Sequence, residues 1–137
     1  MLGRQDGEGV NRAVIGVGSN IEPEVNVPRA RERIARRHVI VAESPLVETR
    51  PIGYVRQPDF TNGALLVETR VGCERLRADL KAIEVLLGRE PGKDRYGPRT
   101  IDLDIVVWNG DVVDHDLYTR DYLRDAVLAV LPDLKLP

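Results

Sequence analysis

Alternating and helically spaced apolar residues divide this chain into short strands and three helices. Short runs rich in apolar and β-branched residues indicate strands over residues 13–17, 39–47, 64–69 and 100–108. Apolar residues at every third or fourth position predict helices from about Val25 or Asn26 to Arg37, from Cys73 to Leu87, and from Thr119 to Val130.

Turn-forming residues define the joints between these elements. Pro45 lies inside the second strand run, so that strand should lie at a sheet edge or contain a bulge. Asn109–Gly110 is the dipeptide favoured in type I′ turns, so Asp111–Asp114 should pair back as a hairpin strand. Thr119 has the side chain needed to cap the last helix.

The order of elements predicts the fold class. The chain reads β-α-β-β-α-β, followed by a hairpin strand and a helix. This order predicts an α+β protein with a ferredoxin-like antiparallel sheet, helices packed on one face, and a C-terminal hairpin strand and helix. We expect the other face of the sheet to stay open for a ligand. Residues 1–12 should form a disordered lead, and residues 13–137 a single domain.

Composition and charge narrow the classes of function. The chain has 137 residues, a net charge of -2 and 42% hydrophobic residues, which predicts one globular domain without affinity for nucleic acid or membranes. Cys73 is the only cysteine, so the chain can form no internal disulfide and no thiolate zinc cluster. We expect a cytoplasmic location. Any anion site must be built from local groups.

The clearest chemical signal is the pair Asp102 and Asp104. Because side chains alternate along a strand, both carboxylates should project from one face, about 7 Å apart, while Leu103 enters the core. Paired carboxylates repel each other, and a divalent cation removes that repulsion. Oxygen ligands of this kind favour Mg²⁺ shared with substrate phosphates. The alternative is a pair of solvated carboxylates on an ordinary strand.

A cationic loop precedes this strand. It contains Arg89, Lys93, Arg95 and Arg99. Phosphoryl transfer requires positive groups beside the metal ions, because negative charge develops on the phosphate oxygens. A basic loop is more often simply solvated, but its position beside the two aspartates favours a phosphate site.

A third group lies where residues 57–62 lead into a strand. Phe60 is the only phenylalanine, and Asn62 follows it by two positions. A flat heterocycle could stack on the ring and hydrogen-bond to the amide. The alternative is a core phenylalanine beside a turn asparagine. The two histidines, His38 and His115, show no ligand spacing and are expected at the surface, and Trp108 should pack in the core.

Together these segments resemble the 6-hydroxymethyl-7,8-dihydropterin pyrophosphokinase family. The resemblance rests on four motifs in order: residues 15–20 (IGVGSN), 49–53 with 57–62 (TRPIG, QPDFTN), 87–89 (LGR) and 95–104 (RYGPRTIDLD). It covers residues 13 to about 114, and the combination is specific although each motif alone is weak.

The resemblance implies a site and a reaction. Two Mg²⁺ ions would be bound by Asp102 and Asp104, and the ATP phosphates would contact Arg89 and Arg99, the implied catalytic residues. Lys81 and Glu84 match positions beside the nucleotide. The implied pterin pocket consists of Thr49, Ile52, Phe60 and Asn62. The implied reaction is ATP-dependent pyrophosphoryl transfer to the hydroxymethyl group of the pterin, releasing AMP, in folate biosynthesis. Other folate-pathway enzymes are partners that the resemblance allows.

The C-terminal region departs from the family. Its members follow the hairpin with a Pro-His segment, an arginine and a second stacking phenylalanine, whereas residues 117–134 are shorter here. Tyr122 or Tyr118 could supply the stacking ring, and Arg120 or Arg124 the cation. Two other functions therefore stay open: a nucleotide- or pterin-binding module, and a pyrophosphokinase for a different alcohol.

Overall fold

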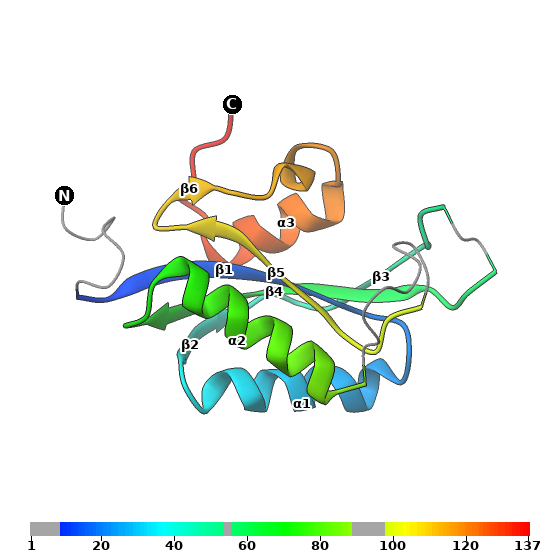
Figure 1. The fold of residues 1–137 in the computed structure, drawn as a ribbon. Helices are drawn as coiled ribbons and strands as arrows, with labels where there is room; N and C mark the ends of the chain where they lie inside the picture. The colour runs from blue at the N-terminus through cyan, green and yellow to red at the C-terminus, as the bar shows by residue number, and fades with distance from the viewer. Residues whose placement is uncertain (1–8, 54–55, 89–97) are drawn as a thin grey trace.

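A single antiparallel sheet organises the molecule (Figure 1). The structure, a computed structural model, describes residues 9–53, 56–88 and 98–137. Its strands are β1 (Asn11–Ser19), β2 (Val39–Glu43), β3 (Val47–Thr49), β4 (Phe60–Thr69), β5 (Asp102–Trp108) and β6 (Asp111–Val112). Its helices are α1 (Pro23–Ala35), α2 (Cys73–Leu86) and α3 (Asp121–Val130), with a short 3₁₀ helix, η2 (His115–Tyr118).

The strand order is β2-β4-β1-β5-β6, with β3 also paired to β4. β1 is central and pairs antiparallel with both β4 and β5. The two β-α-β units therefore interleave as the ferredoxin-like plan requires, and the predicted α+β class is confirmed. The break between β2 and β3 falls at Pro45, as expected for a proline in an edge strand. Asn109 and Gly110 both have positive φ, which confirms the predicted hairpin turn.

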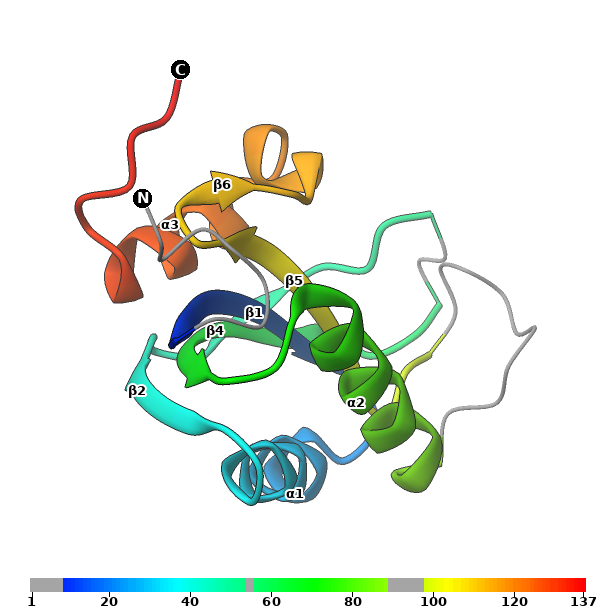
Figure 2. The same ribbon diagram turned by 60° about the vertical axis from the view of Figure 1, so that its left-hand side comes forward.

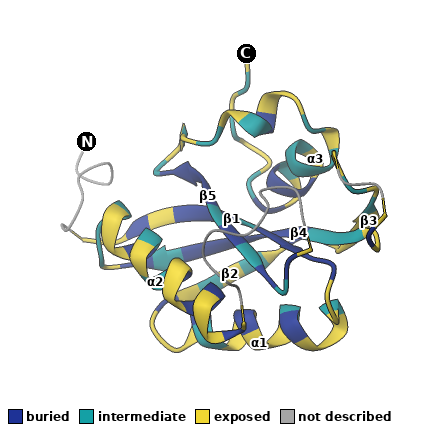
Figure 3. Ribbon diagram, turned by 45° about the vertical axis from the view of Figure 1, so that its right-hand side comes forward, coloured by how far each residue is buried: buried dark blue, intermediate teal, exposed yellow. Residues whose placement is uncertain are grey.

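The sheet lies between α3 on one side and α1 and α2 on the other (Figure 2). Each side has its own hydrophobic cluster. On one face, α1 and α2 bury Ile15 and Leu103 against Ile34 and Leu80. On the other face, α3 packs Val127 against residues that include Val14. Buried residues are concentrated on the central strands, and exposed residues on the outer faces of the helices (Figure 3).

Four expectations need correction. The second sheet face is not fully open, because α3 covers the part of it over β4 and β1. The last helix begins at Asp121, and its N-cap is Arg120 rather than Thr119. Thr119 instead caps the C-terminus of η2, where its backbone N–H donates to the Asp116 carbonyl. A single capping-type residue could not reveal that a 3₁₀ turn would come first.

The third correction concerns the N-terminal lead. The expected disorder through residue 12 is wrong for its last two residues, because β1 begins at Asn11. The buried Asn11 amide donates to the Val71 carbonyl at 2.9 Å. Arg12 pairs with Glu68 at 2.9 Å. These polar residues extend the strand through partners that lie far away in the sequence.

The expectation that both histidines lie at the surface holds for His115 but is wrong for His38. His38 is buried, with Nδ1 2.7 Å from Thr69 Oγ1 and Nε2 3.2 Å from Asp79. Burial lowers the pKa of His38, although Asp79 opposes this shift. Trp108 is buried in the core, as expected.

Candidate active site

Two aspartates of β5 lie on the sheet face opposite α1 and α2. Asp102 and Asp104 alternate with Leu103 and Ile105, which are buried in the core beneath those helices. This alternation is the one that the sequence predicted. Both carboxylates line a small cavity of about 70 Å³ that also includes Asp114.

The electrostatics of this cavity favour a cation. Burial raises the pKa of Asp104 to about 6, and the charge of Asp102 is the next largest cause, with smaller contributions from Glu84 and Asp114. Lys81 opposes the shift from 3.6 Å, and the Asp104 side chain remains 48% exposed. The negative charge of Asp102 therefore disfavours ionisation of Asp104, which is a condition under which paired carboxylates bind a metal ion.

The number of protein ligands is limited. Within residues 9–53, 56–88 and 98–137, no three His, Cys, Asp or Glu side chains are arranged to hold a metal ion together. Asp102 and Asp104 can supply only part of a coordination sphere. Mg²⁺ fits such a donor set, because it is usually bound by one or two carboxylates together with substrate phosphates and water.

A second cavity, of about 110 Å³, adjoins the first. Its lining brings together the four residues singled out as pterin-binding: Thr49, Ile52, Phe60 and Asn62. They come from β3, β4 and the loop between them. The Asn62 amide donates to Thr49 Oγ1 at 2.6 Å, which fixes the orientation of the amide. Asp102 lines both cavities, so the pocket opens directly toward the carboxylates.

Gly18 of β1 keeps this junction open. A Cβ at this position would lie 3.1 Å from Asn62 Oδ1 and 4.0 Å from the Phe60 ring. A side chain at this position would press on the Asn62 amide and shift it. The close approach of Asn62 therefore favours glycine here.

The C-terminal region supplies a second aromatic wall that sequence reasoning left undecided. Tyr122, in the first turn of α3, and Arg120 just before it line both cavities. Arg120 Nη1 lies 3.4 Å from the Tyr122 hydroxyl, and Arg120 pairs with Asp116 at 3.7 Å. The two residues are only two positions apart in the sequence, but that spacing alone does not show that both side chains face the site. The way η2 leads into α3 places them there.

The other candidates lie elsewhere. Tyr118 is 44% exposed, and its ring centroid lies 5.8 Å from that of His115. Arg124 pairs with Asp121 at 2.9 Å. Neither Tyr118 nor Arg124 lines the two cavities.

Asn20 connects the segments that surround the pocket. Its amide donates to Gln57 Oε1 at 2.7 Å and to the Pro58 carbonyl at 3.0 Å. Its Oδ1 accepts from the Arg99 N–H at 2.8 Å, and its own N–H donates to the Arg99 carbonyl at 3.0 Å. Sequence reasoning gave this residue no role of its own. Its position directly after Gly18 and Ser19, at the end of a buried strand, was the available signal.

The expected phosphate-binding residues are only partly described. Arg99 is 6% exposed and lines the 110 Å³ cavity, with Nη1 donating to the Pro98 carbonyl at 3.3 Å. Arg89, Lys93 and Arg95 lie outside the described residues.

Glu84 and Lys81 of α2 lie behind β5. The Glu84 carboxylate is 2% exposed and accepts the Leu103 N–H at 2.7 Å. Lys81 Nζ lies 3.4 Å from Glu84 and 3.6 Å from Asp104. These contacts brace the strand between its two aspartates and place a cation beside Asp104. The expected contacts of Lys81 and Glu84 with the nucleotide stay predictions.

Comparison with known proteins decides the family. The sequence model of the family "7,8-dihydro-6-hydroxymethylpterin-pyrophosphokinase (HPPK)" matches residues 14–136. The chain belongs to this family. HPPK members are pyrophosphokinases, so the chain is a transferase of that class, as the motifs indicated.

Named relatives agree with this membership. The "2-amino-4-hydroxy-6-hydroxymethyldihydropteridine pyrophosphokinase" of Pseudomonas aeruginosa is 32% identical over 139 residues, which cover 93% of this chain and 85% of that protein. The protein of the same name from Bacillus subtilis is 34% identical over 131 residues, covering 90% and 78%. The mitochondrial "Folate synthesis bifunctional protein" of Arabidopsis thaliana is 37% identical over 130 residues, and this chain covers only 23% of it.

Proposed function

We propose that this HPPK transfers the pyrophosphoryl group of ATP to 6-hydroxymethyl-7,8-dihydropterin in folate biosynthesis. The hydroxymethyl oxygen attacks the β-phosphorus, the bond from the β-phosphorus to the oxygen bridging it to the α-phosphorus breaks, and AMP leaves. The hydroxyl proton passes to water or to a phosphate oxygen. The observation that carries this proposal is the pair of adjoining cavities, one with aromatic and amide groups and one with carboxylates, which share Asp102.

Asp102 and Asp104 would hold Mg²⁺, and we expect two ions. Bound Mg²⁺ would neutralise charge on the transferred phosphates. The raised pKa of Asp104 supports this role, because the aspartate cluster disfavours its own ionisation and gains from a cation.

Cationic side chains would stabilise the negative charge of the reacting phosphates. Arg99 is well placed for this, since it lines the pocket at the end of the segment fixed by Asn20. Arg89 remains a candidate by its match to the family motif. Lys81 would act from behind β5, through Asp104, and Glu84 would hold the strand in position.

The pterin would lie between Phe60 and Tyr122. Asn62, held by Thr49, would hydrogen-bond to the ring edge, and Ile52 would cover the opening. Two aromatic walls and one oriented amide suit a flat, hydrogen-bonding heterocycle. Positioning the hydroxymethyl group toward Asp102 would supply most of the protein's contribution to the rate.

The test is the identity of the product. Incubation with ATP, Mg²⁺ and 6-hydroxymethyl-7,8-dihydropterin should release AMP, measured by chromatography. Attack at the γ-phosphorus would instead release ADP. The matched control is a dihydropterin that has a methyl group in place of the hydroxymethyl group, which should give no AMP. Intact ATP binding with no AMP from any pterin alcohol would replace this proposal with a binding module.

The cellular setting is a further part of the proposal. Within the described residues, no helix is long and apolar enough to cross a membrane. We propose action in the cytoplasm, although the name of the Arabidopsis relative includes "mitochondrial". That relative's name also describes a bifunctional folate-synthesis protein, which supports other folate-pathway enzymes as partners of this chain.

A further inference from the structure

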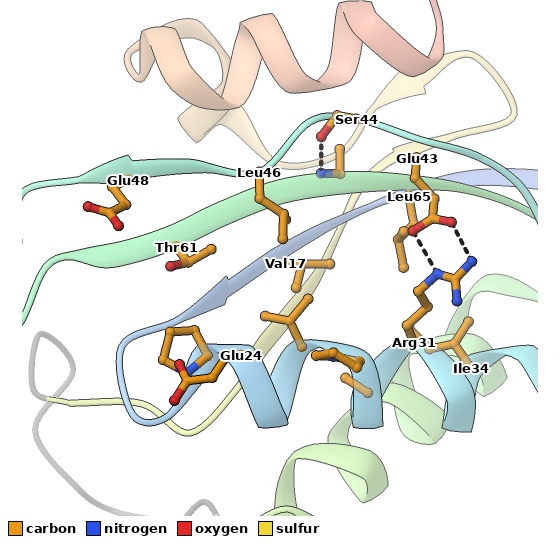
Figure 4. A pocket seen from close by; sticks show the side chains of 15 residues that line it. Val17, Glu24, Arg31, Ile34, Glu43, Ser44, Leu46, Glu48, Thr61 and Leu65 are labelled. Atoms are coloured by element: carbon orange, nitrogen blue, oxygen red, sulfur yellow. Dashed lines mark hydrogen bonds and ion pairs between the residues drawn. The ribbon is translucent and has the colours of Figure 1, made fainter.

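A larger groove lies on the other face of the sheet, between α1 and the edge formed by β2, β3 and β4 (Figure 4). Its volume is about 520 Å³. This size falls within the range of roughly 300–1,000 Å³ that small-molecule sites usually have. Nothing in the reaction proposed above uses this groove.

The walls of the groove are mainly apolar. Val17, Ile34 and Leu65 form the interior, and Leu46, which is 53% exposed, extends across it. Gly63 makes room for this leucine, because a Cβ at that position would lie 2.7 Å from the Leu46 Cδ2. Val17, Ile34 and Leu65 are themselves buried, so the apolar lining that solvent reaches comes from Leu46 and Pro28, which are exposed, and from the half-buried Val27.

The charged residues at the groove make it acidic. Arg31 is the one cation among the described residues that line it, and it pairs with Glu43, with Nε 2.6 Å from Oε1 (Figure 4). Glu24 and Glu48 also line the groove, and neither makes an ion pair within the described part of the chain. Pro28 has no N–H, so it cannot donate the usual helical hydrogen bond to the backbone carbonyl of Glu24. That carbonyl adds a hydrogen-bond acceptor at the groove.

We propose that this groove binds a small amine with an apolar body and one protonated nitrogen. The apolar body would lie against Val27, Pro28 and Leu46. The nitrogen would lie toward Glu24 and Glu48, whose carboxylates pair with no cation in the described part of the chain. Because Arg31 is paired with Glu43, no described cation in the groove is free for an anionic ligand, so the charge complementarity selects a cation.

The groove lies directly behind the pterin pocket. In the pairing of β3 with β4, Glu48 stands opposite Thr61, and the next pair is Thr49 with Phe60. Glu48 and Thr61 line the groove, whereas Thr49 and Phe60 line the pocket on the other face. β3 is only three residues long and pairs only with β4. An amine in the groove should therefore shift β3 and change the affinity of the pocket for the pterin. This coupling, unlike the binding of the amine itself, rests on the proposed function.

The first experiment measures binding without reference to catalysis. The probes are three naphthalene compounds of similar size: 2-(1-naphthyl)ethylamine, 2-(1-naphthyl)ethanol and 1-naphthylacetate. Amide NMR shifts would locate each probe, with shifts expected in α1 and at residues 61–65. We expect the amine to bind about tenfold more tightly than the alcohol, and the acetate more weakly still. Equal affinity for amine and acetate, or shifts confined to the pterin pocket, would overturn the proposal.

Charge variants identify the site. Glu24→Gln and Glu48→Gln should each weaken amine binding about three- to fivefold and leave binding of the alcohol unchanged. The control is Glu32→Gln, which removes a carboxylate of α1 that pairs with Arg36 and does not line the groove. An equal loss in the control would show a general field effect and contradict the assignment of the site.

The last measurement tests the coupling. The dissociation constant of the pterin, measured by calorimetry, should change at least about twofold when the amine is saturating, and by linkage the pterin should change the amine affinity equally. An unchanged pterin affinity would overturn the coupling and leave the amine site intact. Absence of pterin binding at any amine concentration would contradict the proposed function instead.

Discussion

Two regions on opposite faces of the sheet have cavities of opposite character, although the same strands build both. On β1, Gly18 lines the two cavities that include Asp102, whereas the side chain of its neighbour Val17 lies on the side of the groove beside α1. On β4, Asn62 and Thr61 divide in the same way. Around Asp102, the face opposite α1 has two small cavities with charged and hydrogen-bonding walls, whereas the region beside α1 has a larger apolar groove. Because side chains alternate along a strand, the paired strands β1 and β4 can line two cavities with different kinds of wall.

The largest expected difference between the faces is in catalysis. Asp104→Asn should lower kcat about 100-fold or more, because a carboxylate proposed to hold Mg²⁺ is lost. At pH 8, where Asp104 is ionised because its pKa is about 6, the thermal midpoint should be unchanged or higher, since a partly buried charge is removed. Steady-state kinetics and thermal unfolding check both results. Asp125→Asn, an exposed change on α3, is the control, and normal Mg²⁺-dependent turnover in Asp104→Asn would contradict the metal assignment.

A smaller effect should separate the walls of the pterin pocket. Tyr122→Ala should raise the KM for the pterin about tenfold, because one stacking surface is lost, and should change kcat little. Tyr122→Phe keeps the ring and should behave like the wild type. Tyr118→Ala is the matched control, because that exposed ring does not line the pocket. A larger effect at Tyr118 than at Tyr122 would reverse the assignment of the second wall.

The smallest effect concerns stability on the helix face, at His38. Its pKa is lowered in the fold by burial, so in the window below about 6.5 the unfolded chain binds more protons. The free energy of unfolding should therefore fall as pH decreases through that window. His38→Gln should cost about 1–3 kcal/mol at pH 8, through loss of buried hydrogen bonds to Thr69 and Asp79, and should flatten the pH dependence. Urea unfolding at pH 8 and pH 5.5 measures both, and an equally steep pH dependence in the variant would show that another group is responsible.

The sequence predicted correctly those features that depend only on neighbouring residues, such as side-chain alternation and turn conformation. The alternation around Asp102 and Asp104 follows from strand geometry, and the Asn109–Gly110 turn follows from backbone preference. Order along the chain was enough to derive the ferredoxin-like sheet.

Features that depend on distant partners were not accessible in this way. The burial of His38 is decided by Thr69 and Asp79, which no local pattern connects to it. The choice of Tyr122 over Tyr118 depends on how η2 turns the chain before α3. The groove beside α1 arises from the packing of five elements, α1, β1, β2, β3 and β4, so no single segment predicts it.

The contacts of Asn20 have a consequence for biosynthesis. Its partners lie 37 and 79 residues later, at Gln57 and Arg99. The strands that pair with β1, namely β4 and β5, also come later in the sequence. During translation the N-terminal strand therefore leaves the ribosome well before any segment that can cover it, at about 5–20 residues per second. For several seconds Ile15 and its neighbours have no native strand to pair with, and a chaperone that holds this apolar segment would act in that interval.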